Sequence, residues 1–465
     1  MSRQAAVKRT SHFTSINPAT GKEIASYEEM QPAEVAHIIE KTHAAFLDWR
    51  KKSFSERAQP MKAAAKILRD RAEAFGKLMA EEMGKPVSDG IAEAQKCALG
   101  CDYFAENAEK FLAREEIKTD AAKSFVTYRP LGVVLAVMPW NFPFWQVFRF
   151  VAPGLMAGNA GVLKHASNVQ GSALAIEGIL REAGFPENLF RTLVVSSRQV
   201  DAILENPLIC AATLTGSEAA GRAVASKAGA MLKKTVLELG GSDAYVVLDD
   251  ADLDKAATIS AKGRLVNAGQ SCIAAKRFIV TEKTRTRFEA LFVAKMRAIT
   301  FGDPMDKNTK IGPMARHDLR DALHAQVEKS IAKGAKCLLG GAIPSGPGAY
   351  YPPTVLTDVK KGMPAYEEEL FGPVASVITV KNEEEALKTA NDSVFGLGGA
   401  VLSADRARAE RLAAEVIEAG SVFVNEAVKS DPRLPFGGIK QSGYGRELSV
   451  HGIREFLNVK TVYVA

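Results

Sequence analysis

The chain lacks several features that mark specialised classes of protein. No run of about 18 apolar residues occurs in its 465 residues, so no transmembrane helix is expected. Residues 1–9 lack the apolar stretch of a secretory signal and are predicted to form a short polar tail. There is no Arg-rich run with interleaved aromatics, which gives nucleic-acid binding little support. Neither a membrane nor a nucleic acid is therefore expected as a partner.

Cysteine is also scarce. The five cysteines are an odd number and are spread thinly along the chain. This favours free thiols in a reducing, cytoplasmic setting over a disulfide framework. Cys97 and Cys101 fall on one face of a predicted helix, but neither a His nor a further Cys is near them in the sequence. A metal pair is not predicted there, and no metal is expected as a cofactor.

The remaining composition is that of an ordinary globular protein. Apolar residues make up 47% of the chain and charged residues 25%, which is within the normal range. The 60 basic and 54 acidic residues leave a net charge of +6, a mild excess that helps to attract anionic ligands. A chain of this length exceeds one ordinary core, so two or three domains are expected.

The order of apolar runs predicts an α/β fold. Ser53 and Glu56 form a capping box, and apolar residues then recur at helical spacing over 61–79. From residue 131, short apolar runs alternate with helical stretches, which is typical of parallel sheets covered on both faces. Strands are expected in a first series at 131–138, 161–164, 193–195, 211–214 and 236–239, and in a second at 244–248, 278–280, 374–380 and 422–424.

Two further segments suggest an element outside the two series, which divide near residue 241. The polar stretch 118–129 predicts a hairpin that extends from the first domain. The tail at 459–464 has the pattern of a strand without an obvious partner in its own neighbourhood. Because an exposed strand edge is an aggregation hazard, we expect the tail to pair with another subunit.

Two motifs supply a nucleophile and a base. Cys272 ends the stretch 269–272 (GQSC), and Glu238 begins 238–241 (ELGG). A thiol that attacks a carbonyl carbon and a carboxylate that activates water are what covalent catalysis on an aldehyde or acyl carbon needs. Each residue alone has a simpler explanation, since a single Cys is more often a small buried apolar residue and a Glu after a strand is usually an exposed charge.

Taken together with further motifs, these stretches resemble the aldehyde dehydrogenase superfamily, and within it the bacterial succinate-semialdehyde dehydrogenases. The resemblance covers nearly the whole chain. It rests on 139–143 (PWNFP), 164–167 (KHAS), 215–217 (TGS), 238–241 (ELGG), 269–272 (GQSC) and 369–373 (ELFGP), in the family's order, and on 435–438 (PFGG) and 442–447 (SGYGRE).

The resemblance implies two parallel-sheet domains of Rossmann type and a small β element for oligomerisation. Residues 1–114 and 131–240 would form the dinucleotide-binding domain, and 241–440 the catalytic domain. The oligomerisation element would comprise 115–130 and 441–465, in a homodimer or tetramer.

The implied reaction is NAD(P)-dependent oxidation of an aldehyde to its acid, with succinate semialdehyde as the expected substrate. Cys272 would attack the aldehyde to give a thiohemiacetal, hydride loss would leave a thioester, and water would cleave it. The side-chain amide of Asn141 and the backbone N–H of Cys272 would stabilise the oxyanion. Taken alone, Asn141 is also explained as a turn residue that precedes a proline. Glu238 would activate the water, and it is also a candidate base for Cys272, since a free Cys is only slightly ionised at neutral pH.

The cofactor site departs from the usual dinucleotide fingerprint, because the chain contains no Gly-x-Gly-x-x-Gly. Gly216 and Ser217 follow a predicted strand and open a helix at 218–227, whose free N–H groups suit a phosphate; a Ser there is also explained as an N-cap. The resemblance implies cofactor contacts from Trp140, Lys164, Ser167, Gly216, Ser217, Leu239, Glu369 and Phe371. Where strictly NAD-dependent relatives often have a Glu for the ribose 2′-hydroxyl, this chain has Ser167, so use of both NAD and NADP is expected.

Substrate choice depends on fewer residues. In semialdehyde-oxidising relatives an Arg at the position of Arg149 binds the distal carboxylate, which a guanidinium fork suits. The alternative is an Arg held in a salt bridge of the protein itself. A second Arg of some relatives is replaced here by Val266. Trp145 is expected to line the substrate tunnel, and Ser430 to add a hydroxyl to the same pocket.

Three other functions stay open at this point. The first is oxidation of another small aldehyde. In the second the acyl group passes to coenzyme A, which requires no water-activating Glu, so that Glu238 argues against it. In the third the chain is a non-catalytic protein that kept the fold, against which the intact set of Cys272, Glu238 and Asn141 argues.

Overall fold

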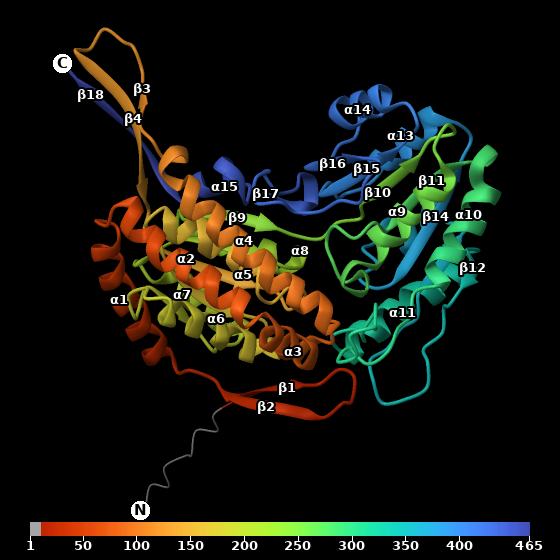
Figure 1. The fold of residues 1–465 in the computed structure, drawn as a ribbon, viewed down its shortest axis with the longest axis horizontal. Helices are drawn as coiled ribbons and strands as arrows, with labels where there is room; N and C mark the ends of the chain where they lie inside the picture. Colours follow the sequence, from red (N-terminus) through yellow and green to blue (C-terminus); the bar gives the residue numbers. More distant parts are fainter. Residues whose placement is uncertain (1–10) are drawn as a thin grey trace, which may run out of the picture.

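The protein has two lobes and a projecting arm (Figure 1). The computed structural model describes residues 11–465, so the predicted polar tail at 1–9 lies outside the described residues. Each lobe contains a largely parallel sheet with helices packed on it, which confirms the predicted α/β class. Of the helices formed by residues 11–465, none combines the length and apolarity needed to cross a membrane.

The sheet of the first lobe has six strands in the order β17-β9-β8-β5-β6-β7. Its parallel strands are β5 (Val133–Met138), β6 (Ala160–His165), β7 (Phe190–Thr192), β8 (Ile209–Thr215) and β9 (Lys234–Glu238), and β17 (Gly443–Tyr444) is antiparallel to β9. The chain passes from β5 to β6 and β7 on one side, then places β8 on the other side of β5. Such a reversal leaves a crevice at the carboxyl ends of β5 and β8, where open α/β sheets bind ligands.

Helices surround this sheet. They are α1 (Pro32–Trp49), α2 (Phe54–Asp70), α3 (Ala72–Met83), α4 (Val87–Phe111), α5 (Trp145–Met156), α6 (Gln170–Glu182), α7 (Val200–Glu205), α8 (Glu218–Ala230) and α15 (Ser449–Arg454), with short 3-10 turns η1 (Ser167–Val169) and η2 (Ser197–Gln199). The capping box of Ser53 and Glu56 opens α2 as predicted. The apolar face predicted over 61–79 is shared by α2 and α3, with Met61 and Met79 both fully buried. Every residue of α5 is buried, so this helix carries its polar side chains into the interior.

The second lobe is built on seven strands in the order β12-β13-β14-β11-β10-β15-β16. They are β10 (Ala244–Val247), β11 (Arg277–Thr281), β12 (Lys336–Leu339), β13 (Thr354–Thr357), β14 (Val374–Val380), β15 (Gly398–Leu402) and β16 (Ser421–Val424), with β12 alone antiparallel among them. The helices are α9 (Leu253–Leu265), α10 (Glu282–Arg297), α11 (His317–Ala332), α12 (Pro364–Glu367), α13 (Glu383–Asn391) and α14 (Arg406–Glu415), with the turns η3 (Val266–Gly269) and η4 (Lys440–Ser442). The four strands predicted for this series are confirmed.

The arm is a three-stranded sheet in the order β18-β4-β3. It consists of β3 (Glu115–Glu116), β4 (Lys123–Pro130) and β18 (Leu457–Val464), and Figure 1 shows it projecting from the first lobe with the C-terminus at its end. A separate hairpin of β1 (His12–Ile16) and β2 (Glu23–Glu28) lies on the opposite side of the molecule.

Three expectations about strands are corrected. The tail has a partner in its own chain, because β18 pairs antiparallel with β4 along its whole length; only its other edge lacks a strand among residues 11–465. Part of 441–465 also belongs to the first lobe, where β17 pairs with β9. The strand expected at 193–195 is displaced to β7, since the apolar run there is buried but continues no ladder beyond the bond from Leu193 N to Leu163 O.

Candidate active site

Residues that follow β5 and β8, together with Cys272, line one cavity, and Glu238 lies at the end of the neighbouring β9. Asn141 follows β5, Ser217 follows β8 and Glu238 ends β9, while Cys272 comes from the other lobe, just before β11. The cavity has a volume of about 270 Å³; we call it the strand-end cavity. It is lined by Pro139, Trp140, Asn141, Thr215, Gly216, Ser217, Leu239, Gly240, Cys272, Leu319, Glu369 and Phe371. The carboxyl edge of the first sheet thus faces the predicted nucleophile, as the switch of strand order requires.

The loop that carries Cys272 has an unusual backbone. Asn267, Ala268 and Gly269 are left-handed in succession, with φ of 53°, 57° and 73°. A Cβ on Gly269 would lie 2.1 Å from the carbonyl oxygen of Gly372, so only glycine fits there. Asn267 Nδ2 donates to the carbonyl of Asn141 at 2.7 Å, which ties the strained turn to the end of β5. Strain of this kind persists where surrounding contacts enforce it, and it is common at functional sites.

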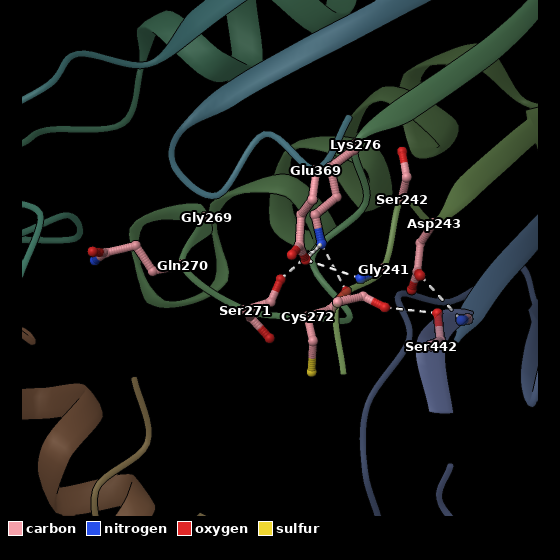
Figure 2. A network of polar contacts seen from close by, with 12 residues as sticks. Gly241, Ser242, Asp243, Gly269, Gln270, Ser271, Cys272, Lys276, Glu369 and Ser442 are labelled. Carbon is pink, nitrogen blue, oxygen red and sulfur yellow. Dashed lines mark hydrogen bonds and ion pairs between the residues drawn. The ribbon is translucent and has the colours of Figure 1, made fainter. Parts of the chain in front are cut away.

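A buried lysine fixes the backbone of the nucleophile (Figure 2). Lys276 Nζ donates to the carbonyls of Ser271 at 2.9 Å and Cys272 at 2.7 Å, and it forms an ion pair with Glu369 Oε1 at 3.1 Å. Figure 2 shows the sulfur of Cys272 pointing away from this network. The Cys272 side chain is therefore free of the polar contacts that hold its backbone, and it lines the strand-end cavity.

The thiol of Cys272 is protonated in this environment. Burial raises the pKa of Cys272 to about 12, although Arg149 and Lys276 act in the opposite direction. Because the thiolate is the nucleophile, a base has to remove the proton when the substrate arrives.

Glu238 is a buried carboxyl group with no partner. It is 1% exposed, and neither of its carboxyl oxygens has a hydrogen bond from residues 11–465. Burial first, and the nearby Glu447 second, raise the pKa of Glu238, whereas Arg149 lowers it. An unsatisfied carboxyl group of this kind costs stability, and such groups cluster at functional sites because a raised pKa suits a general base.

Asn141 is oriented toward the Cys272 loop. Its side chain is 4% exposed, and Nδ2 donates to the carbonyl of Gln270 at 3.1 Å. Its Oδ1 accepts from the backbone N–H of Phe142 at 3.1 Å, so the amide has a fixed orientation with the donor toward the loop. This is the orientation that an oxyanion donor next to Cys272 requires.

Arg149 is held in a salt bridge, which favours the second of the two roles that the sequence left open for it. Its Nε forms an ion pair with Glu447 Oε2 at 2.7 Å, and the two side chains are only 2% and 5% exposed. The guanidinium carbon also lies 4.7 Å from the ring centroid of Phe436. The charge is thus already paired inside the protein, and Arg149 lines neither of the two larger cavities at the site. The alternative, a salt bridge of the protein itself, describes this residue.

Trp145 and Ser430 are in contact, and their role in a substrate pocket stays a prediction. Trp145 Nε1 donates to Ser430 Oγ at 3.0 Å. Trp145 lines a second cavity of about 670 Å³, which we call the lysine-lined cavity. Its walls include Lys85, Asp89, Glu93, Lys96, Phe142, Trp145, Lys262, Val266, Asn267, Lys295 and Lys310. Asn141 faces the strand-end cavity and the adjacent Phe142 faces the lysine-lined cavity, so the two spaces flank the same turn.

Six of the eight predicted cofactor residues line the strand-end cavity: Trp140, Gly216, Ser217, Leu239, Glu369 and Phe371. Ser217 caps α8 by accepting from Ala220 N at 3.4 Å, and the helix N-terminus provides a site for a phosphate. The rings of Trp140 and Phe371 are 5.7 Å apart and form an apolar wall for a nicotinamide ring. The contacts from Gly241 N and Lys276 to the Glu369 side chain use only Oε1, which leaves Oε2 for a ribose hydroxyl.

Lys164 and Ser167 lie outside this cavity but at the same carboxyl edge. Lys164 is at the end of β6, and Ser167 is exposed at the start of η1. Burial lowers the pKa of Lys164. Within residues 11–465 its ammonium group makes neither a hydrogen bond nor an ion pair, so the chain offers a cation without a counter-ion beside the nucleotide crevice. Together these features fit a bound dinucleotide.

Comparison with known proteins agrees with this geometry. Residues 6–462 match the aldehyde dehydrogenase family. The chain belongs to this family. A probable succinate-semialdehyde dehydrogenase [NADP(+)] of Synechocystis sp. is 50% identical over 453 residues, which cover 97% of this chain and 100% of that protein. A succinate-semialdehyde dehydrogenase [NADP(+)] 1 of Mycobacterium tuberculosis is 49% identical over 456 residues, with the same coverage of 97% and 100%.

Solved structures show the same fold. Succinic semialdehyde dehydrogenase from Streptococcus pyogenes, in complex with NADP+, has a TM-score of 0.95 and 38% identity over 97% of this chain and 99% of that one. Betaine aldehyde dehydrogenase from Staphylococcus aureus, in complex with NAD+, has a TM-score of 0.93 and 28% identity over 97% of this chain and 92% of that one. The predicted family and fold class are therefore confirmed.

Three residues of this aldehyde dehydrogenase site were not predicted from the sequence. Lys276 and Glu447 were missed because a single Lys or Glu carries no pattern, although Glu447 lies within the recognised segment 442–447. Lys96 was missed because it occupies one turn of a long helix, α4, with ordinary neighbours. All three are charged side chains that are buried or half-buried at the site, and this burial cannot be predicted from the sequence.

Proposed function

We propose that this aldehyde dehydrogenase oxidises succinate semialdehyde to succinate with NADP as the hydride acceptor. One observation carries the proposal: Cys272 and Asn141 line a cavity suited to a dinucleotide, and the buried Glu238 is near enough to raise the pKa of Cys272. The turn that carries Asn141 also borders a second cavity with several lysines. The names of the Synechocystis and Mycobacterium relatives, at about half identity over their full lengths, support the substrate.

In the first step Cys272 adds to the aldehyde carbon. Glu238 takes the thiol proton, the S–C bond forms, and the carbonyl electron pair moves to oxygen. Asn141 Nδ2 and the backbone N–H of Cys272 donate to that oxyanion; within residues 11–465 the Cys272 N–H makes no other hydrogen bond. Loss of one such donor typically costs on the order of a hundredfold to a thousandfold in rate.

A nicotinamide cofactor, held between residues of the strand-end cavity such as Trp140, Glu369 and Phe371, would supply the acceptor for the hydride that leaves the thiohemiacetal carbon. As the C=O bond forms again, Cys272 is left as a thioester. Trp140 and Phe371 exclude water from this side of the reacting carbon, and Lys276 keeps the Cys272 backbone in place.

Water then releases the acid. Glu238 first releases the thiol proton to solvent and then removes a proton from the water; the oxygen adds to the thioester carbon, and the C–S bond breaks with Cys272 leaving as thiolate. The proton on Glu238 is available to the thiolate or to solvent, so the site returns to its starting state. Because Glu238 has to be ionised for this step, its raised pKa makes turnover increase with pH in the range where the carboxyl group titrates.

The chain's own residues support NADP at the ribose. Lys164 offers a cation without a counter-ion, and exposed Ser167 offers a hydroxyl where a carboxylate would repel a 2′-phosphate. We extend the proposal to use of NAD as well, with a lower preference. The first lobe would be the dinucleotide-binding domain, and the second lobe the catalytic domain.

A homo-oligomer and a cytoplasmic location complete the proposal. The outer edge of β18 has no neighbouring strand among residues 11–465, and a strand of a second copy would cover it. All five cysteines are free, which suits a reducing compartment.

An initial-rate panel tests the function. Succinate semialdehyde, butanal, propanal and betaine aldehyde are each supplied with NAD and with NADP, and reduced cofactor is followed by its absorbance. We expect the highest kcat/KM for succinate semialdehyde with NADP. Equal or higher kcat/KM for uncharged aldehydes would overturn the substrate, and the absence of NADPH formation would overturn the cofactor.

A further inference from the structure

Three side chains from distant segments meet beside the lysine-lined cavity, and two of them, Lys96 and Trp145, line it. Lys96 lies on α4, Trp145 begins α5, and Ser430 follows β16. Lys96 Nζ donates to Ser430 Oγ at 2.7 Å and lies 4.4 Å from the ring centroid of Trp145. The indole N–H of Trp145 donates to the same hydroxyl oxygen at 3.0 Å. These contacts hold the ammonium group of Lys96 in one place.

The charge of Lys96 is not neutralised by the protein. Among residues 11–465 no carboxylate oxygen lies within 4.0 Å of its Nζ, whereas three other lysines of the cavity are paired: Lys85 with Glu93, Lys262 with Glu426, and Lys295 with Asp254. The nearest acidic groups are committed elsewhere. Glu93 accepts from the backbone N–H groups of Phe144 and Trp145, both at 2.9 Å, besides its pair with Lys85, and Asp431 is paired with Arg433.

Ser430 has a hydrogen to give. Its oxygen accepts from Lys96 and from Trp145, and within residues 11–465 its own O–H donates to no acceptor. The ammonium group of Lys96 likewise has three hydrogens and one protein acceptor. Two donors, one of them charged, are thus left for a single ligand at this wall. Burial lowers the pKa of Lys96 to about 8, and an anion beside it would favour the charged form again.

We propose that Lys96, together with the hydroxyl of Ser430, binds the distal carboxylate of the semialdehyde. The assignment rests on the proposed function and replaces Arg149 as the residue that recognises that carboxylate. Lys96 is suitable because its charge has no partner in the protein, whereas the charge of Arg149 is paired with Glu447. Phe142 and Trp145 line the cavity beside Lys96, and Phe142 follows Asn141 directly in the sequence, so the anchor and the oxyanion donor flank the same turn.

Replacement of Lys96 tests this assignment. Lys96→Met keeps the length of the side chain and removes its charge. The ratio of kcat/KM for succinate semialdehyde to kcat/KM for butanal is expected to fall about tenfold to a hundredfold, the range for a lost charge-assisted hydrogen bond. Lys96→Arg should keep more of this ratio than Lys96→Met. Lys262→Met is the matched control, since this lysine of the same cavity is exposed and already paired, and its variant should keep the ratio.

A binding measurement separates recognition from turnover. Succinate is tested as an inhibitor of butanal oxidation, with butyrate as the uncharged-end analogue. We expect succinate to inhibit the wild type more strongly than butyrate does, and Lys96→Met to lose that difference. Ser430→Ala, which leaves the cation in place, should reduce the difference only in part, and it provides a second measurement if Lys96→Met folds poorly.

The outcomes distinguish this inference from the proposed function. If the wild type does not prefer succinate semialdehyde to butanal, the proposed substrate is wrong and the anchor is wrong with it. If the wild type has the preference and Lys96→Met retains the full ratio, only the assignment of Lys96 is overturned. Equal losses for both aldehydes, with succinate inhibition unchanged, would likewise make Lys96 a structural residue.

Discussion

Arg149→Met separates the two roles that the sequence left open for this residue. In the structure Arg149 is the cation between two buried carboxyl groups: it pairs with Glu447 and it lowers the pKa of Glu238. Methionine fills a similar volume beside Phe436 but carries no charge. The variant therefore leaves Glu447 and Glu238, which are 5% and 1% exposed, without the arginine that compensates them.

The expected cost is large. Removing one partner of a buried ion pair typically destabilises a protein by about 3–5 kcal/mol, because the remaining charge is buried and unpaired. The sign of the pH dependence follows from the same contacts. Without Arg149 the pKa values of both carboxyl groups in the folded state rise further above their unfolded values. The folded variant then holds protons that the unfolded chain has released, so its stability falls as pH rises above the ordinary Glu range.

Urea unfolding, followed by tryptophan fluorescence at several pH values, measures this cost. Glu447→Gln in the Arg149→Met background removes the unpaired charge and should restore a large part of the loss, and the four proteins form a double-mutant cycle. Both Arg149 variants should lower kcat/KM for succinate semialdehyde and for butanal by similar factors. The reasoning is refuted if Arg149→Met is as stable as the wild type and loses activity on succinate semialdehyde alone.

Three further variants test the reaction itself. Cys272→Ala should abolish aldehyde oxidation and retain NADP binding, measured by quenching of protein fluorescence; near-normal turnover would contradict the role of the thiol. Glu238→Gln should still give one burst of NADPH, formed more slowly because the thiol loses its base, and should slow the steady rate further, by about a hundredfold or more, in rapid-mixing absorbance measurements; a burst at the wild-type rate would mean that Glu238 acts on water alone, and equal loss of burst and steady rate that it acts mainly on Cys272. Ser167→Glu should shift the ratio of kcat/KM toward NAD, since the new carboxylate would repel a 2′-phosphate; an unchanged ratio would show that Ser167 does not face the ribose.

The catalytic part of the site was accessible to sequence reasoning because its residues lie at strand ends. Buried parallel strands are continuous apolar runs, and a motif that follows such a run falls at the carboxyl edge of the sheet. Asn141 after β5, Ser217 after β8 and Glu238 at the end of β9 follow this rule. The pattern places these residues at one edge of the sheet, while their roles came from the family resemblance.

Long-range pairing was not accessible in the same way. The partner of β18 is β4, which lies far away in the sequence, and most of β18 is exposed, so no buried apolar run marks the pairing. The strand predicted at 193–195 was wrong for the opposite reason. Its residues are buried, but burial in a parallel sheet domain does not require strand geometry. Apolar patterning reports which residues are buried, and it reports secondary structure only where the backbone also forms a ladder.

The substrate residues show a further limit, which concerns charge. A resemblance assigns a role to a position, and Arg149 occupies a position at which relatives bind a carboxylate. Whether a cation is available to a ligand depends on which carboxylate of the protein is nearest, and for Arg149 that partner is Glu447, near the other end of the chain. Lys96, by contrast, is available to a ligand, because its acidic neighbours Glu93 and Asp431 have other partners. Recognition of an anion in this cavity is therefore decided by the pairing of charges across the fold, and the comparison of Lys96→Met with Arg149→Met measures that pairing. Lys96→Met should change substrate preference with little loss of stability. Arg149→Met should lower stability and leave substrate preference nearly unchanged.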